Sequence, residues 1–252
     1  MKIIASDYDG TLNYNGIDEA KRSAIRKWRD AGNLFVLVSG RHSANVRQLH
    51  IDQQFPCDYF IGSNGAVIRS SENEVLHSDC CDMDMLLPLI RFLFALGCPY
   101  ALVHGEQDWF YTYPEPSLMP REPACTLETM PEVTCYTQVT TQMPTESEAV
   151  SIAQKVRECF GDRFNPLQNG TSVDIVRADV NKAGGLSRLL ELTGAEHGDM
   201  ITVGDNINDS DMLREFKSYA MENGVPAIKE LADFVTPGVA ELIERELREV
   251  QL

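Results

Sequence analysis

Residues 3–12 read Ile3-Ile4-Ala5-Ser6-Asp7-Tyr8-Asp9-Gly10-Thr11-Leu12, so that a short apolar run leads directly into two carboxylates, a glycine and a hydroxyl. The apolar run predicts a strand of a parallel sheet. The carboxylates then lie at its carboxyl end, where open α/β sheets bind their ligands. Gly10 allows the backbone to turn tightly after them. We therefore expect an α/β fold with polar chemistry at its first strand.

The two aspartates of this segment, Asp7 and Asp9, have two interpretations. Carboxylates this close repel each other unless a cation or a shared proton separates them, and Mg²⁺ with its oxygen ligands suits the cation role. Asp7 would then carry a nucleophilic oxygen onto phosphorus, while Asp9 exchanges a proton with the leaving group and afterwards with water. The other interpretation is a solvated turn after a strand. Residues 3–12 alone do not decide between them.

Length and composition indicate a soluble globular protein. The chain has 252 residues, 43% of them hydrophobic, which is enough for one large domain or two ordinary ones. Its formal net charge of -16 disfavours a nucleic-acid backbone or an anionic membrane as the main partner. An anionic substrate would need cationic side chains gathered locally.

The seven cysteines include the adjacent pair Cys80 and Cys81. Their odd number and the absence of a Cys-x-x-Cys motif argue against a disulfide framework or a zinc site, and favour a reducing, cytoplasmic compartment. The first strand follows Met1-Lys2 directly, so we expect no signal peptide. The longest apolar segment, residues 86–97, is too short to span a bilayer and predicts a core-facing helix.

Two further apolar strands end in small polar residues. Residues 34–38 are continuously apolar and lead into Ser39-Gly40-Arg41, and residues 59–61 lead into Gly62-Ser63-Asn64-Gly65-Ala66. Three predicted strands, including the one that leads into Asp7, therefore end in polar residues and a glycine. A simpler interpretation makes Ser39 the N-cap of a helix over residues 43–49, and makes Asn64-Gly65 a hairpin turn.

The order of predicted elements changes over residues 82–178, where a helix is followed by alternating strands, a long proline-containing segment, and another helix and strand. This change predicts an inserted domain. Residues 82–178 contain a strand pair over 100–104 and 108–113, and a strand over 134–141. A proline-punctuated segment over 113–132 predicts a long loop, of the kind that forms lids or specificity elements. Its one cation, Arg121, is expected to be solvated rather than to contact substrate. The predicted domains are a core of residues 1–81 and 179–252 and a cap of residues 82–178.

The last third of the chain supplies the remaining charged groups. Lys182 opens a predicted helix, where an ammonium opposes the helix dipole unless an anion binds there. A strand over residues 200–203 leads into Gly204-Asp205-Asn206-Ile207-Asn208-Asp209. Asp205 and Asp209 are one helical turn apart and can address one cation from the same side. A solvated lysine and a capping acidic turn are the simpler alternatives.

Taken together, these residues contain the groups that phosphoryl transfer needs: a nucleophile, an acid/base, phosphate donors and a hard-cation site. No Gly-x-x-x-x-Gly-Lys-Ser/Thr loop and no Gly-x-Gly-x-x-Gly after a strand is present, which disfavours nucleotide-driven kinase and dinucleotide functions. The histidines lack zinc-ligand spacing. The candidate residues are Asp7, Asp9, Ser39, Lys182, Asp205, Asn208 and Asp209.

The motifs, in this order, resemble those of the haloacid dehalogenase superfamily, and within it the Cof-type phosphatases. The four motifs are Asp7-Tyr8-Asp9-Gly10-Thr11, Ser39-Gly40-Arg41, Lys182, and residues 204–209. The resemblance implies a Rossmann-like parallel-sheet core with an inserted α/β cap of the C2B type. One departure is Ala183, since the family commonly has glycine after the lysine.

The resemblance also implies roles for the catalytic and metal-binding residues. Asp7 forms an aspartyl-phosphate, and Asp9 protonates the leaving group and then activates water. Mg²⁺ is held by the Asp7 carboxylate, the Asp9 backbone carbonyl and Asp205, with Asp209 supporting it.

The implied phosphate-binding residues are Ser39, Gly40, Lys182 and Asn208. Asn208 positions either Lys182 or the phosphate, and we expect loss of Lys182 to impair the chemistry more than folding. Asp174 is a candidate substrate-facing residue of the cap.

The expected activity is Mg²⁺-dependent hydrolysis of small phosphate esters, sugar phosphates first among them. A phosphomannomutase-like mutase and a non-catalytic phosphometabolite sensor remain alternatives. The expected partner is the small-molecule substrate, with neither nucleic acid nor membrane, and the sequence leaves the oligomeric state open.

Overall fold

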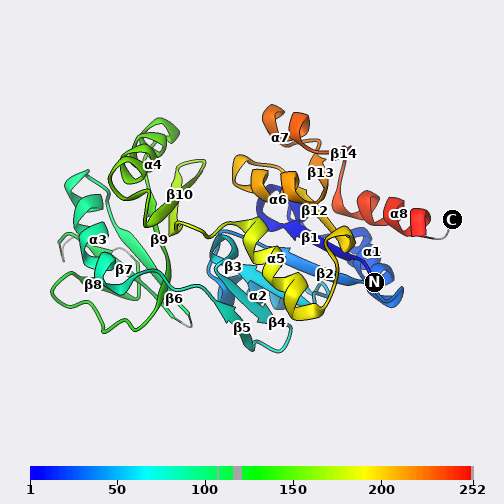
Figure 1. The fold of residues 1–252 in the computed structure, drawn as a ribbon, viewed down its shortest axis with the longest axis horizontal. Coiled ribbons are helices and arrows are strands. Elements are labelled where there is room, and N and C mark those ends of the chain that lie inside the picture. The colour runs from blue at the N-terminus through cyan, green and yellow to red at the C-terminus, as the bar shows by residue number, and fades with distance from the viewer. Residues whose placement is uncertain (107, 116–120, 251–252) are drawn as a thin grey trace. The chain divides into compact units, whose positions relative to one another are not determined.

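The computed structural model describes residues 1–106, 108–115 and 121–250. The chain divides into two compact units. Unit 1 comprises Met1–Leu76 and the chain from Asn181 onward, and unit 2 comprises His77–Val180. Figure 1 shows the elements of each unit along the chain.

Unit 1 is built on an eight-stranded sheet in the order β14-β13-β12-β1-β2-β3-β4-β5. The strands from β14 to β3 are parallel to their neighbours, whereas β4 runs antiparallel to β3. The first strand of the chain therefore lies inside the sheet, as the apolar run at residues 3–7 predicts. The strands are β1 Ile3–Asp7, β2 Leu34–Val38, β3 Tyr59–Gly62, β4 Val67–Ser70, β5 Val75–Ser78, β12 Met200–Gly204, β13 Lys217–Met221 and β14 Phe234–Thr236.

Helices cover both faces of this sheet, which explains why its central strands are continuously apolar. On one face Ile4 of β1 packs in a core with Trp28 of α1 and side chains of α8. On the other face Ile3 and Ala5 pack in a core with Leu189 of α5 and side chains of α6 and α7. The helices are α1 Glu19–Asp30, α2 Ser43–Gln53, α5 Lys182–Thr193, α6 Ser210–Glu215, α7 Pro226–Leu231 and α8 Val239–Val250.

Unit 2 is a six-stranded sheet in the order β10-β11-β9-β6-β7-β8. Its helices pack on one face, where Leu89 and Val156 join Val103 and Val139 in a single core. Neighbouring strands are antiparallel except β7 and β8. Its elements are α3 Leu86–Ala95, β6 Ala101–Gly105, β7 Trp109–Tyr113, β8 Ala124–Thr126, β9 Tyr136–Gln142, α4 Glu146–Phe160, β10 Phe164–Asn169 and β11 Ser172–Arg177.

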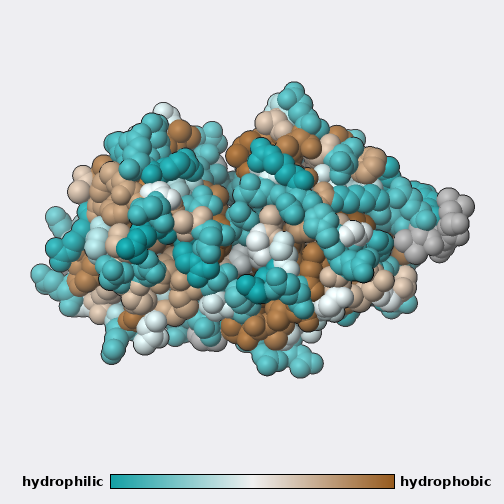
Figure 2. All heavy atoms as spheres, viewed as in Figure 1, coloured by the Kyte–Doolittle hydropathy of each residue, from teal (hydrophilic) through white to brown (hydrophobic). Residues whose placement is uncertain are grey.

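The face of the molecule drawn in Figure 2 is largely polar. Figure 2 shows hydrophilic residues over much of the face in view, with apolar residues scattered among them, in keeping with the net charge of -16. None of the described helices is both long enough and apolar enough to cross a membrane.

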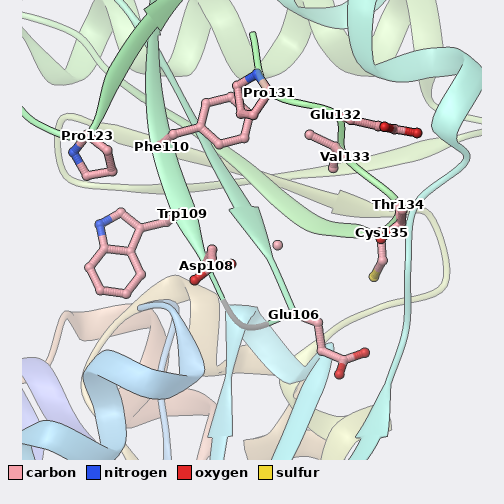
Figure 3. A pocket seen from close by; sticks show the side chains of 11 residues that line it. Glu106, Asp108, Trp109, Phe110, Pro123, Pro131, Glu132, Val133, Thr134 and Cys135 are labelled. Carbon is pink, nitrogen blue, oxygen red and sulfur yellow. The ribbon is translucent and has the colours of Figure 1, made fainter.

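A pocket in unit 2 lies where β6 leads towards β7 (Figure 3). Three acidic residues, Glu106, Asp108 and Glu132, are among the residues that line it, together with Trp109 and Phe110. Negative charge near the pocket disfavours an anionic ligand such as a phosphate group.

Residues 77–81, which include the last two residues of β5, and residues 179–180 belong to unit 2, whereas the predicted core domain included them. Local bonds account for the difference. The Cys81 N–H donates to the Tyr136 carbonyl at 2.7 Å. The Arg177 guanidinium lies 2.7 Å from the Asp79 carboxylate. Residues 79 and 81 are thus bonded to β9 and β11, two strands of unit 2.

Cys80 and Cys135 form a disulfide, and the expectation from the cysteine pattern was wrong on this point. The pair is separated by 55 positions and is brought together by folding, so neither the odd number of cysteines nor the missing Cys-x-x-Cys could reveal it. The five other cysteines carry free thiols. The predicted cytoplasmic location loses the support of the cysteines and stays a prediction.

Two strands that were not predicted from the sequence contain a proline or lie next to one. Within the predicted loop, Ala124–Thr126 forms β8 and pairs with β7; residues 116–120 of that loop lie outside the described residues. Pro166 lies in β10, which is an edge strand. Proline argues against a strand in general but is tolerated at a sheet edge, where its missing N–H is not needed.

Candidate active site

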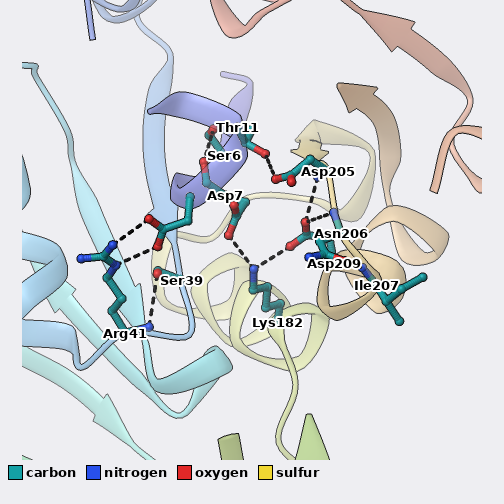
Figure 4. Close-up of polar contacts among 11 residues, drawn as sticks. Ser6, Asp7, Thr11, Ser39, Arg41, Lys182, Asp205, Asn206, Ile207 and Asp209 are labelled. Carbon is teal, nitrogen blue, oxygen red and sulfur yellow. Dashed lines mark hydrogen bonds and ion pairs between the residues drawn. The ribbon is translucent and has the colours of Figure 1, made fainter. Parts of the chain in front are cut away.

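The predicted strand ends come together at one edge of the unit 1 sheet. Asp7 is the last residue of β1, and Asp205 directly follows β12. The two strands are parallel neighbours, with Ser6 opposite Val203. Their carboxylates therefore leave the sheet side by side, as Figure 4 shows.

A third carboxylate joins them from the turn after β12. One oxygen atom from each of Asp7, Asp205 and Asp209 lies within 4.8 Å of the others. Asp209 ends the short helical turn Ile207–Asp209. Its Oδ2 accepts the backbone N–H groups of Asp205 at 2.9 Å and Asn206 at 3.1 Å. The turn predicted from the four-residue spacing thus places Asp205 and Asp209 together.

Lys182 is the cation of this cluster. It is the first residue of α5, whose N-cap Asn181 accepts the Gly184 N–H at 2.8 Å. Lys182 Nζ donates to Asp7 Oδ1 at 2.7 Å and to Asp209 Oδ1 at 2.5 Å. The side chain is buried, so the alternative of a solvated lysine is wrong.

Burial and charge shift the pKa values of these groups. Burial raises the pKa of Asp7 well above its ordinary value; the Lys182 ammonium opposes this rise, and the Asp209 carboxylate adds to it. Burial also raises the pKa of Asp205, against the hydrogen bond from Thr11. Burial alone would lower the pKa of Lys182, but the two carboxylates outweigh it and the pKa is raised. One ammonium therefore faces an excess of negative charge, which a divalent cation would balance.

Thr11 and Gly10 support Asp205 from the first motif. Thr11 Oγ1 donates to Asp205 Oδ1 at 2.6 Å. Gly10 has a φ of +81°, and a Cβ atom there would lie 2.4 Å from Asp205 Oδ2. The sequence predicts no role for either residue at the carboxylate cluster, because their partner Asp205 is far away in the chain.

Asp9 lies apart from the carboxylate cluster and pairs with Arg41 instead. Arg41 Nε donates to Asp9 Oδ2 and Arg41 Nη2 to Asp9 Oδ1, each at 2.7 Å. The Asp9 side chain is 46% exposed. Arg41 belongs to the second motif, but the sequence predicted no role for it. The signal that could have indicated one is a guanidinium directly after the predicted phosphate-binding residues.

Ser39 directly follows β2 and is buried. Its Oγ accepts the Arg41 N–H at 3.2 Å, and its carbonyl accepts the Asn64 N–H at 3.1 Å. The N-cap of α2 is His42, whose Nδ1 accepts the Ala44 N–H, so the alternative of Ser39 as the cap is wrong. The hairpin alternative for residues 64–65 is confirmed, because this turn joins the antiparallel β3 and β4.

The remaining candidates divide between the units. Gly40 follows Ser39, and Asn208 lies half-buried in the turn that ends at Asp209; their roles towards phosphate stay predictions. In unit 2, Asp174 accepts a hydrogen bond from Thr140 at 2.7 Å, and its role towards substrate is likewise a prediction. The Arg121 guanidinium lies over the Tyr100 and Tyr111 rings, 5.4 and 5.6 Å from their centroids.

Comparison with known proteins places this geometry in a family. A model of the haloacid dehalogenase-like hydrolases matches residues 4–241. A 5-amino-6-(5-phospho-D-ribitylamino)uracil phosphatase of Bacillus subtilis is 25% identical over 261 residues, which cover 96% of this chain and 94% of that protein.

Solved structures share the fold along nearly the whole chain. A HAD/COF-like hydrolase from Plasmodium vivax has a TM-score of 0.85 at 18% identity, covering 98% of this chain and 96% of that chain. A sugar phosphatase of HAD subclass IIB has a TM-score of 0.80 at 19% identity, covering 97% of this chain and 98% of that chain. The predicted Rossmann-like core with an inserted C2B-type α/β cap is thus confirmed. The chain belongs to the haloacid dehalogenase-like hydrolases and, as its four motifs predicted, is an enzyme of the phosphatase class.

Proposed function

We propose that the protein is a Mg²⁺-dependent phosphatase that hydrolyses small phosphorylated metabolites through an aspartyl-phosphate on Asp7. One observation carries the proposal. Asp7, Asp205 and Asp209 each offer an oxygen within 4.8 Å of the others, and Lys182 donates to Asp7 and Asp209. A carboxylate nucleophile, a hard-cation site and an ammonium that can bind phosphoryl oxygens are the groups that this reaction uses.

The donor atoms fit Mg²⁺, which prefers hard oxygen ligands. The Asp7 and Asp205 carboxylates and the Asp9 backbone carbonyl would hold the ion. Both Asp209 oxygens accept hydrogen bonds, so Asp209 supports the site by holding Lys182 and the Asp205 backbone. When bound, Mg²⁺ would neutralise phosphoryl charge and favour the ionised form of Asp7.

In the first step an Asp7 carboxylate oxygen attacks phosphorus and the bond to the leaving oxygen breaks. Asp9, entering this step protonated, gives its proton to that oxygen, so the product leaves as an alcohol. Lys182 holds the phosphoryl oxygens together with Ser39 Oγ and the Gly40 backbone, and Asn208 positions these groups. Lys182 is already fixed by Asp7 and Asp209 before substrate binds, which preorganises the positive charge.

In the second step water attacks the phosphorus of the aspartyl-phosphate. Asp9, now a carboxylate, accepts a proton from this water, and the bond between phosphorus and the Asp7 oxygen breaks. Inorganic phosphate leaves, Asp7 returns as a carboxylate and Asp9 is again protonated. The cycle thus begins and ends with the same protonation states.

Sugar phosphates are the substrate class that we propose first. The support is the fold shared with the subclass IIB sugar phosphatase and the resemblance to the Bacillus subtilis phosphatase, whose named substrate carries a phosphorylated ribityl chain. Sugar phosphates and this phosphorylated ribityl compound are both small phosphate esters of polyhydroxylated carbon chains.

The test is phosphate release from a panel of sugar phosphates, nucleotides and p-nitrophenyl phosphate, with Mg²⁺ and with EDTA, for wild type, Asp7→Asn and Asp9→Asn. We expect release to require Mg²⁺ and Asp7, and Asp9→Asn to lose about 10²- to 10⁴-fold on sugar phosphates. Equal, slight losses in both variants would contradict the assigned roles. If the folded protein released no phosphate from any ester, the mutase and sensor alternatives would replace this proposal.

A further inference from the structure

Arg41 makes a two-point contact with the carboxylate to which the proposed function gives the proton transfers. Its Nε and Nη2 each lie 2.7 Å from a different oxygen of Asp9. Planar guanidinium and carboxylate groups that meet through two parallel hydrogen bonds fix each other's orientation, which a single contact cannot do. The Arg41 guanidinium also lies over the Tyr8 ring, 5.5 Å from its centroid, and this ring borders the same turn.

The backbone of Arg41 is held from both sides. Its N–H donates to Ser39 Oγ, and its carbonyl accepts the Ser63 N–H at 2.8 Å. Ser63 is buried and has a φ of +50°, a left-handed conformation that non-glycine residues seldom adopt. The segment after β3 thus anchors the backbone from which Arg41 reaches Asp9.

Within the described part of the chain, Arg41 is the residue that hydrogen-bonds to the Asp9 side chain. Asp9 lies in the turn Tyr8–Leu12 with non-helical φ and ψ angles, and its side chain is about half exposed. An exposed aspartate without a fixed partner samples several rotamers. A proton donor must present its oxygen within hydrogen-bond reach of the leaving group, so free rotation would reduce the fraction of productive complexes.

We propose that Arg41 is a positioning residue that holds the Asp9 carboxyl group in the orientation needed for proton transfer to the leaving group. This inference rests on the proposed function. When Asp9 carries the proton, one of its oxygens becomes a donor towards the leaving oxygen, and the other keeps its hydrogen bond to Arg41. After the transfer both oxygens accept from the guanidinium again. Arg41 itself neither gains nor loses a proton.

The leaving group separates this role from a contact with the phosphoryl group. An alkoxide leaves poorly without a proton, whereas p-nitrophenolate is stable as an anion and needs none. Loss of an Asp9-positioning residue should therefore harm alkyl esters and spare the aryl ester. Loss of a phosphoryl contact would harm both equally. The comparison uses kcat/KM, which depends only on the steps up to departure of the leaving group. The later hydrolysis of the aspartyl-phosphate therefore does not affect the measured ratio.

The experiment measures kcat/KM for one sugar phosphate that wild type hydrolyses and for p-nitrophenyl phosphate, in Arg41→Ala, Arg41→Lys and the control Arg26→Ala. Arg26 forms an exposed ion pair with Glu19 within α1, and neither residue is a candidate site residue. We expect Arg41→Ala to lose about 10- to 100-fold on the sugar phosphate, a part of the usual contribution of a general acid, and less than about 3-fold on the aryl ester. Arg26→Ala should match wild type on both.

Arg41→Lys keeps the charge without the two-point contact, and should recover only part of the loss on the sugar phosphate. Full recovery would mean that charge alone acts, and would overturn the positioning role. Equal losses on both esters in Arg41→Ala, or no loss on either, would also overturn it while leaving the phosphatase in place. A wild type inactive on both esters would overturn the proposed function and this inference together.

Discussion

Lys182 Nζ donates a 2.5 Å hydrogen bond to Asp209 Oδ1, and both side chains are buried. The same ammonium donates to Asp7. A buried ion pair of this kind adds little over an apolar pair, but breaking it leaves charge stranded in a low dielectric. We therefore expect the candidate site and the stability of unit 1 to depend on the same lysine.

We predict that Lys182→Met destabilises the metal-free protein by about 3–5 kcal/mol, because the buried Asp7 and Asp209 carboxylates lose the ammonium that donates to both. Chemical denaturation in EDTA measures this, with Lys27→Met on the exposed face of α1 as the control, expected within about 0.5 kcal/mol of wild type. The expectation from sequence, that loss of Lys182 impairs chemistry more than folding, stays a prediction. A variant as stable as wild type would contradict the destabilisation expected here.

Mg²⁺ should stabilise the folded protein through the carboxylate cluster. A ligand that binds only the native state adds about 2.7 kcal/mol at 100 times its Kd. We expect the Tm of wild type to rise with MgCl₂ at constant ionic strength, and that of Asp205→Asn to stay nearly unchanged. Thermal unfolding with NaCl as the ionic-strength control measures both. An equal rise in the two proteins would place the bound cation elsewhere.

Gly10→Ala should weaken Mg²⁺ binding by displacing the Asp205 carboxylate, since the new Cβ would lie 2.4 Å from Asp205 Oδ2. Displaced ligands and their supporting groups typically cost 10- to 100-fold in metal affinity. Gly32→Ala is a matched control: Gly32 has a φ of +80° but nothing within 4 Å of its Cβ position. Both variants carry the same backbone strain, so a loss of Mg²⁺-dependent stabilisation in Gly10→Ala alone identifies the clash. Equal losses of Mg²⁺-dependent stabilisation in the two variants would mean that backbone strain, and not the clash with Asp205, causes the loss.

The parts of the site that sequence predicted are those fixed by strand periodicity. Asp7 is the last residue of a buried parallel strand, and Ser39 and Asp205 each directly follow one. Such strand ends meet at one edge of a sheet. Asp209 and Lys182 followed from helical spacing and from a charge that opposes its own helix dipole. These signals are local, and a short segment displays them completely.

The parts that sequence could not predict depend on contacts between distant segments. Arg41 meets Asp9 across 32 positions, and Thr11 meets Asp205 across 194. Neither partner leaves a trace in the other's local pattern, because side-chain direction becomes fixed only when the turns are in place. Strands β8 and β10 were missed for the opposite reason. A nearby proline locally argues against a strand, but both strands lie at an edge of their sheet, where proline is tolerated.

The disulfide between Cys80 and Cys135 leads to the last prediction. It closes a loop of 55 positions in unit 2, and a cross-link of that span restricts the unfolded chain by about 4 kcal/mol. Without reductant, the denatured protein should show five reactive thiols, against seven after full reduction. Reductant should then lower the denaturation midpoint of wild type and leave Cys80→Ser unchanged. Seven reactive thiols in protein that never met a reductant would mean that the pair stays reduced, and would return support to a reducing compartment.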